Sequence, residues 1–465
     1  MINVRRRQFS LVIIALAFLS LSPLLYRSWS RFRLVDVFGF VIMFSYGIWL
    51  FFASGRHRPP GKSSAPQETS DRIDALTKKL ALESHDRAEL LHQRALLQIS
   101  QQEWEAAVED FTAALEYAPD QPRPAEKLIE LYHYRGVALV RLERFKEALQ
   151  DLSVAIKWIE TYPEKAETVV LAETLAERAD CYLVEGDYRL AESDLRKAIP
   201  LLEGDYLLNS RIQLGAILER NSQWKNALDE YELAFTQVST ASEDLAWRAT
   251  IQHARGRTLY SMDRFGDATA ALDEAITIMT SDDELAHNLV DARLIRADAL
   301  LHCGELTKSA LDVGLVLQTS PGDLHARVIR ALIASEKQQF REAMEELHDV
   351  IVQQPDYLPA LQNYAVLLTG AHDDSLRNGA RALEIAETLA SQMGGRNWFP
   401  LSVQAAAHAE LGDFQQAVEL AAQSLEVAPD DQKAGRARRL EQFRQRRPFR
   451  CESFASQRTQ AVRGQ

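Results

Sequence analysis

Residues 136–155, GVALVRLERFKEALQDLSVA, contain the pattern that decides the fold of this chain. Two small residues, Gly136 and Ala148, stand 12 positions apart, and the large apolar Phe145 precedes the second of them by three. Leu152 follows Ala148 by four positions, which places both on one face of a helix. The pattern predicts a helix, a turn and a second helix that packs closely against the first.

The same pattern returns from residue 88 to about residue 431. The first small position holds Ala95, Gly136, Ala179, Gly215, Gly256, Ala297, Ala331, Ala365 and Ala405. The second holds Ala107, Ala148, Ala191, Ala227, Ala268, Ser309, Ala343, Ala382 and Ala417. The large apolar position holds Trp104, Phe145, Tyr188, Trp224, Phe265, Leu306, Phe340 and Phe414. An ordinary helical bundle gives no reason for small residues to recur at a fixed phase, so the pattern favours a repeated helix pair.

This two-helix unit resembles the tetratricopeptide repeat (TPR), whose period is 34 residues. Nine units begin near residues 88, 129, 172, 208, 249, 290, 324, 358 and 398, and two of the spacings between them equal 34. The eighth unit departs most, because extra residues separate its helices and its large apolar residue is missing. The resemblance implies an all-α, TPR-like α-solenoid of about nine helix pairs in a right-handed superhelix, occupying residues 88–431.

The two ends of the array need caps, because no repeat buries its apolar face alone. A cap helix over 70–87 is predicted before the array, with Ile73, Leu76 and Leu80 on one stripe. It follows a flexible Pro/Gly/Ser linker over 55–69.

After the array, a basic capping helix is predicted over 432–450, with Leu440 and Phe443 facing inward, and a disordered tail over 451–465. The helix carries seven arginines within 15 residues, which either lie back on the acidic array or reach anionic lipid.

Two apolar runs stand at the front of the chain. Residues 9–26 contain no charge and would extend about 27 Å as a helix, which is enough to span a hydrocarbon core. Residues 34–54 contain only Asp36, at their edge. Two transmembrane helices that form a hairpin within residues 1–54 are therefore predicted.

Positive charges predict the orientation of this hairpin. Six arginines or lysines flank its outer ends and three occupy its loop, which places the array in the cytoplasm and the chain in the inner, cytoplasmic membrane. In the competing interpretation, Arg6 and Arg7 begin a twin-arginine export signal and the array is periplasmic. The missing cleavage site and the second apolar run favour the hairpin.

Charge also restricts the class of partner. The whole chain has a formal net charge of −13, but residues 1–62 and 432–465 each carry +8, so the remainder carries −29 by difference. Such an acidic array repels phosphate backbones, which argues against binding to nucleic acid.

No catalytic motif stands out in the sequence. It lacks a phosphate-binding loop, a nucleophile elbow and any clustered metal ligands, so neither a cofactor nor catalysis is predicted. The eleven histidines are scattered, and the three cysteines at 181, 303 and 451 have no pairing or metal spacing.

The resemblance implies that the concave surface, lined by the first helices, holds a peptide or a partner helix. The residues at groove-facing positions are His133, Val137, Glu173, Glu177, Asp180, Asn209, Gln213, His253 and Arg257. Since no lysine stands among them, the subclass that grips a C-terminal carboxylate is not indicated. Glu173, Glu177 and Asp180 would suit a basic partner segment, unless they are ordinary solvated charges.

The sequence therefore predicts a membrane-anchored TPR scaffold or adaptor that binds proteins and has no catalytic activity. Two alternatives stay open, an accessory subunit of a membrane enzyme or envelope-assembly complex, and an exported periplasmic scaffold. The sequence does not indicate an oligomeric state.

Overall fold

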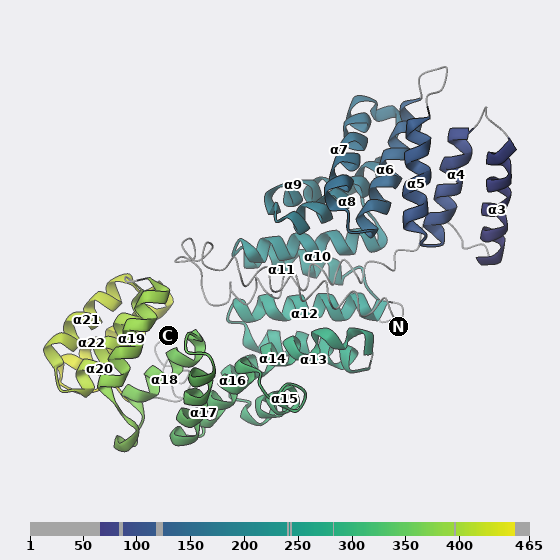
Figure 1. The fold of residues 1–465 in the computed structure, drawn as a ribbon. Helices are drawn as coiled ribbons and strands as arrows, with labels where there is room; N and C mark the ends of the chain where they lie inside the picture. Colours follow the sequence, from purple (N-terminus) through teal and green to yellow (C-terminus); the bar gives the residue numbers. More distant parts are fainter. Residues whose placement is uncertain are drawn as a thin grey trace. The chain divides into compact units, whose positions relative to one another are not determined.

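The chain is an all-α helical repeat. A computed structural model describes residues 66–82, 87–117, 124–239, 241, 244–281, 283–394 and 397–451. Across these ranges there are twenty α-helices, α3 to α22, and no strand (Figure 1).

The predicted membrane spans at 9–26 and 34–54 lie outside the described residues. Among the helices that are described, none is both long enough and apolar enough to cross a membrane.

Nine helix pairs follow one another along the chain, as the repeat predicts. Their first helices are α4 (Arg87–Ser100), α6 (Ala125–Arg141), α8 (Thr168–Glu185), α10 (Gly204–Arg220), α12 (Leu245–Ser261), α14 (Leu289–Cys303), α16 (Leu324–Glu336), α18 (Leu358–Gly370) and α20 (Trp398–Glu410). Their second helices are α5 (Trp104–Glu116), α7 (Phe145–Thr161), α9 (Tyr188–Ala198), α11 (Trp224–Phe235), α13 (Phe265–Ser281), α15 (Leu306–Thr319), α17 (Phe340–Gln353), α19 (Gly379–Met393) and α21 (Phe414–Val427). The large apolar residue of the repeat begins every second helix except α19.

The helices belong to two compact units that meet, along the chain, between Met262 and Asp263. The earlier unit contains α3 to α12 and the later unit contains α13 to α22. Within each unit, neighbouring first helices, such as α6 and α8 or α14 and α16, contact one another more extensively than neighbouring second helices do. The first helices therefore line the inner face of each unit.

The recurring small residues are where the helices approach closely. All nine residues at the second small position have no exposed surface. A Cβ atom added to Gly136 would lie 2.7 Å from Leu152 Cδ2, and one added to Gly215 would lie 2.5 Å from the ring of the fully buried Tyr231. These positions are small because a facing side chain fills the space that a larger residue would need.

A left-handed residue joins the two helices of most pairs, five positions before the second small residue. These residues are Gln102, Glu143, Gly186, Ser222, Asp263, Gly304, Gln338 and Gly412, each with positive φ. The tight turn requires this conformation, which side chains other than glycine adopt at a cost of about 1–2 kcal/mol.

An arginine clamp holds the helices of several pairs together. In four units an arginine and an aspartate 16 residues apart form two hydrogen bonds of 2.6–2.9 Å, in the pairs Arg94–Asp110, Arg135–Asp151, Arg178–Asp194 and Arg296–Asp312. The third nitrogen of each arginine reaches the preceding second helix or cap, at Thr77, Thr112, Ser153 and Asp273. Each clamp therefore joins three helices, and the aspartates are buried.

Both ends of the array carry a further helix. The leading helix, α3 (Pro66–Leu82), begins inside the predicted linker, and it packs Leu76 and Leu80 against α4 and α5. The closing helix, α22 (Asp430–Arg444), buries Leu440 and Phe443 against α20 and α21.

The structure explains why the second helix of the eighth pair, α19, lacks the large apolar residue at its start. The corresponding position is Gly379, and a Cβ atom there would lie 2.9 Å from both the Ala407 carbonyl oxygen and Leu411 Cγ. Helix α20 passes too close for a side chain, so α19 begins with glycine.

Candidate functional site

The groove-facing residues predicted from the sequence all lie on α6, α8, α10 and α12, within the earlier unit. Five of them are buried, namely His133, Glu177, Asn209, Gln213 and His253. Four are partly exposed, namely Val137, Glu173, Asp180 and Arg257. The exposed part of the candidate site is therefore smaller than the sequence suggests.

Glu177 is the centre of a buried cluster that joins three first helices. Its carboxylate accepts two hydrogen bonds from Arg141 on α6, at 2.7 and 3.0 Å, and one from the Tyr206 hydroxyl on α10, at 2.9 Å. Only 1% of the Glu177 surface is exposed. Burial would lower the pKa of Arg141, but the charge and hydrogen bonds of Glu177, together with nearby Tyr206 and Asp180, raise it. The charge of Glu177 is thus used inside the protein.

Asp180 and Glu173 lie on the same face of α8, and each residue is partly exposed. Gln213 Nε2 donates to Asp180 Oδ1 at 2.5 Å. Burial, reinforced by the charge of Glu177, raises the pKa of Asp180 to about 7. The same two causes raise the pKa of Glu173. Since Arg141 is bonded to Glu177, this part of the inner face has an excess of negative charge.

Two buried amide oxygens lie on α10, the neighbouring first helix. Asn209 Oδ1 and Gln213 Oε1 have no hydrogen-bond partner in the described part of the chain. Both are acceptors, as are the carboxylates of Glu173 and Asp180 on α8. We refer to these four residues, Glu173, Asp180, Asn209 and Gln213, as the α8–α10 acceptor face.

His133 is held in the interior by a structural hydrogen bond. Its Nδ1 lies 2.9 Å from Thr174 Oγ1, which already donates to the Val170 carbonyl at 2.5 Å, so the histidine is the donor. Burial lowers the pKa of His133 to about 4, which keeps the ring neutral. In the part of the chain that the structure describes, no cluster of three metal-binding side chains occurs.

A second buried ion pair joins α10 and α12. Arg257 Nη2 donates to Glu219 Oε2 at 2.7 Å, and the Thr258 hydroxyl donates to the other oxygen of Glu219. Arg141, Tyr206 and Glu219 were not identified from the sequence, because they lie outside the groove-facing phases. The only signal available was that the acidic Glu219 directly follows the run 214–218, which has no polar side chain, and Glu219 alone does not identify its partner.

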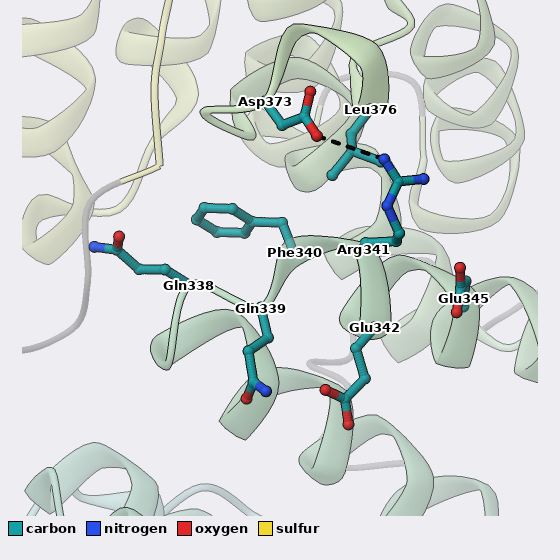
Figure 2. Close-up of a pocket in the computed structure, with 8 residues that line it drawn as sticks. All are labelled: Gln338, Gln339, Phe340, Arg341, Glu342, Glu345, Asp373 and Leu376. Carbon is teal, nitrogen blue, oxygen red and sulfur yellow. Dashed lines mark ion pairs between the residues drawn. The ribbon is translucent and has the colours of Figure 1, made fainter.

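A shallow cleft of about 380 Å³ lies in the later unit, beside the turn between α16 and α17 (Figure 2). Its lining includes Phe340, Glu342 and the ion pair between Arg341 and Asp373, whose atoms are 3.5 Å apart. Figure 2 shows Arg341 directed toward the loop that carries Asp373. The arrangement contains no nucleophile beside a base, so it does not indicate catalysis.

Comparisons with known proteins concern the fold alone. No protein-family model matches the sequence, and no curated protein matches it. Among solved structures, a tetratricopeptide repeat protein from Parabacteroides merdae is 15% identical, covers 58% of this chain and 98% of its own, and gives a TM-score of 0.47. Yeast Tom70 is 16% identical over 86% of this chain and 96% of its own, with a TM-score of 0.36. The apo form of the quorum sensor NprR from B. thuringiensis is 11% identical over 78% and 97%, with a TM-score of 0.43.

These similarities are too distant to indicate a shared ligand. The conclusion that the chain is an all-α helical repeat depends on its own nine helix pairs and on their small residues at fixed positions.

Proposed function

We propose that the protein is a non-catalytic scaffold whose α8–α10 acceptor face binds a basic segment of a partner protein. The observation that carries the proposal is chemical. Two carboxylates with raised pKa values lie on a helix next to two amide oxygens that have no hydrogen-bond partner among the described residues, and the nearby Arg141 is already bonded to Glu177. A lysine or arginine side chain supplies the donors and the positive charge that this face lacks.

The energies favour such a ligand. A hydrogen bond to a charged group contributes about 1.5–3 kcal/mol, and a buried acceptor without a partner costs about 1–3 kcal/mol. One guanidinium or ammonium group that satisfies Asp180 and an amide oxygen on α10 gains both contributions. The Arg141–Glu177–Tyr206 cluster holds α6, α8 and α10 together beforehand, so little ordering is needed on binding.

We further propose that residues 1–54 anchor this scaffold in the inner membrane with the array in the cytoplasm. Two apolar runs and the excess of positive charge outside them support this topology. An accessory subunit of a membrane complex and an exported scaffold remain the alternatives. Protease added outside intact spheroplasts should leave the array uncut, whereas cleavage would indicate export. Replacing the two runs with an unrelated hairpin should leave an adaptor's partners bound but release the partners of an accessory subunit.

Binding can be measured on the full-length protein by fluorescence anisotropy, with a labelled peptide of alternating lysine and alanine as the probe. Replacing both Glu173→Gln and Asp180→Asn should weaken binding by more than tenfold, because two charged acceptors are lost. Glu109→Gln is a suitable control, since Glu109 is exposed on the second helix α5. An equal loss per charge removed in the control would show only general attraction to an acidic protein and would contradict the proposal.

A further inference from the structure

A pair of arginines with unusual surroundings lies at the other end of the chain. Arg436 and Arg439 occupy successive turns of α22, and both reach Ser402 on the first helix α20. Arg436 Nη1 donates to Ser402 Oγ at 2.5 Å, and Arg439 Nη1 lies 3.3 Å from the same oxygen. Two positively charged groups therefore converge on one neutral hydroxyl.

Aromatic rings cover the flat faces of both guanidinium groups. The central carbon of Arg436 lies 4.4 Å from the centroid of the Trp398 ring, and that of Arg439 lies 4.0 Å from the centroid of the Phe449 ring. Stacking on a ring fixes the plane of a guanidinium and leaves its edge for hydrogen bonds. The edges that face Ser402 are therefore held in position.

Arg436 lacks a counter-ion among the described residues. No carboxylate lies within ion-pair distance of it there, and its buried Nε has no hydrogen-bond partner. Burial and the charge of Arg439 both lower the pKa of Arg436. A buried guanidinium without an anion is costly, and this is the situation in which a charged ligand gains most.

Ser402 adds a third donor to the same point. Ser402 as a whole residue is 5% exposed. Its Oγ accepts hydrogen bonds from both arginines, so the hydroxyl hydrogen of Ser402 points away from them. The Arg436 guanidinium and the hydroxyl hydrogen of Ser402 supply donors for the two oxygens of a carboxylate, and Arg439 adds positive charge beside them.

From this geometry we propose that Arg436, Arg439 and Ser402 form a binding site for the carboxylate of an acidic side chain in a partner's segment. The site lies between α20 and α22, where Arg436 and Arg439 are each partly exposed as residues. The exposed arginines of α22, such as Arg444, are the ones that a lipid surface would reach. This site is separate from the α8–α10 acceptor face and has the opposite charge preference.

The net charge of the array does not prevent such binding. At physiological ionic strength, screening reduces interactions between exposed charges beyond about 8 Å, so the guanidinium groups at the site dominate there.

The test measures binding of a fluorescein-labelled hexaglutamate peptide to the full-length protein by fluorescence anisotropy. The salt concentration is about 150 mM, at which the screening length is about 8 Å. Arg436→Gln should weaken binding by about 10- to 100-fold, because at least one charged hydrogen bond is lost. Arg436→Lys should restore part of the affinity, since it keeps the charge but loses the planar edge. Arg444→Gln removes the same charge from an exposed position on α22 and should change binding less than twofold.

Thermal unfolding separates a ligand site from a purely structural cap. Hexaglutamate should raise the melting temperature of the wild-type protein but not that of Arg436→Gln, because only a ligand that binds the folded state stabilises it. Without the peptide, the variant should melt at or above the wild-type temperature, since it no longer buries an uncompensated charge. A lower melting temperature without the peptide, together with unchanged peptide binding, would show that Arg436 only caps the array.

Three other outcomes would also overturn the proposal. They are no binding of hexaglutamate, an equal loss in Arg436→Gln and Arg444→Gln, and Arg436-dependent binding of inorganic phosphate or of phosphatidylglycerol vesicles without binding of the peptide. Asp180→Asn should leave hexaglutamate binding unchanged, so failure of the α8–α10 acceptor face and failure of this site can be told apart.

Discussion

The inner faces of the two compact units are built from different residues. In the earlier unit, helices α6, α8, α10 and α12 bury many polar or charged side chains, among them Glu177, Glu219 and His253. In the later unit, the described first helices α14, α16, α18 and α20 bury only two polar side chains, Thr369 and Ser402. The same repeat therefore joins successive first helices by ion pairs in one unit and by apolar packing in the other.

This difference shows what each type of interface contributes. Apolar packing stabilises in proportion to the area buried and tolerates changes of similar volume. A buried ion pair adds little net stability, but its loss leaves a charge without a partner, so the pairing specifies one arrangement of the helices. The clamp of arginine and aspartate occurs in both compact units. The two units therefore share the packing within helix pairs and differ in the residues that line their inner faces.

The largest expected effect comes from breaking the central ion pair. Arg141→Ala leaves Glu177 charged and buried, and it should destabilise the protein by about 3–5 kcal/mol. Chemical denaturation of the full-length protein measures this cost. The double variant Arg141→Met with Glu177→Leu should recover most of the lost stability, because no charge remains buried. A single variant that unfolds like the wild type would mean that the pair does not specify the interface.

A smaller loss is expected where the helices of a pair meet. Gly215→Ala places a methyl group against the buried ring of Tyr231 and should cost about 1–3 kcal/mol. In the double variant Gly215→Ala with Tyr231→Ala, most of the cost of Gly215→Ala should be recovered, because the added methyl group no longer meets the ring. No recovery would indicate that the backbone, and not the ring, limits the space.

The acidic inner face should make stability depend on pH. The pKa of Asp180 is raised to about 7 in the folded state from an ordinary value of 3.8, so its contribution is fully present below pH 4 and is lost as the pH rises through 7. Asp180→Asn should therefore match the wild type near pH 4 and exceed it at pH 8 by on the order of 1–2 kcal/mol. Denaturation at both pH values tests this, and an equal gain at both would exclude titration as the cause.

The smallest effect is a gain in the later unit. Gly314 lies within α15 with open space around its Cα, so Gly314→Ala should stabilise the helix by about 0.5–1 kcal/mol. Because the site touches no polar inner face, the gain should be the same at pH 4 and pH 8. Thermal unfolding at the two pH values checks this result against that of Asp180→Asn.

Most of the fold could be predicted from the sequence alone. The fixed phase of residues such as Ala148, and the aromatic or leucine that begins every second helix except α19, predicted nine helix pairs because packing at these positions is local and recurs along the array. The inward stripe that ends at Leu80 and the buried Leu440 and Phe443 follow from the same helical periodicity. The left-handed turn residues were missed, since only Gly186, Gly304 and Gly412 carry the glycine that marks such turns.

Only the tertiary structure decided which polar residues are used inside the protein and which remain for a partner. Arg141 and Glu177 are 36 residues apart, and Glu177 and Tyr206 are 29 residues apart. Because the helix pairs differ in length, no single repeat spacing predicts that these side chains meet. The convergence of Arg436 and Arg439 on Ser402, whose distances in sequence from them are 34 and 37, has the same origin. Small and apolar residues pack with neighbours that the helical period identifies, whereas the charge state and partner of a buried polar group depend on every helix around it.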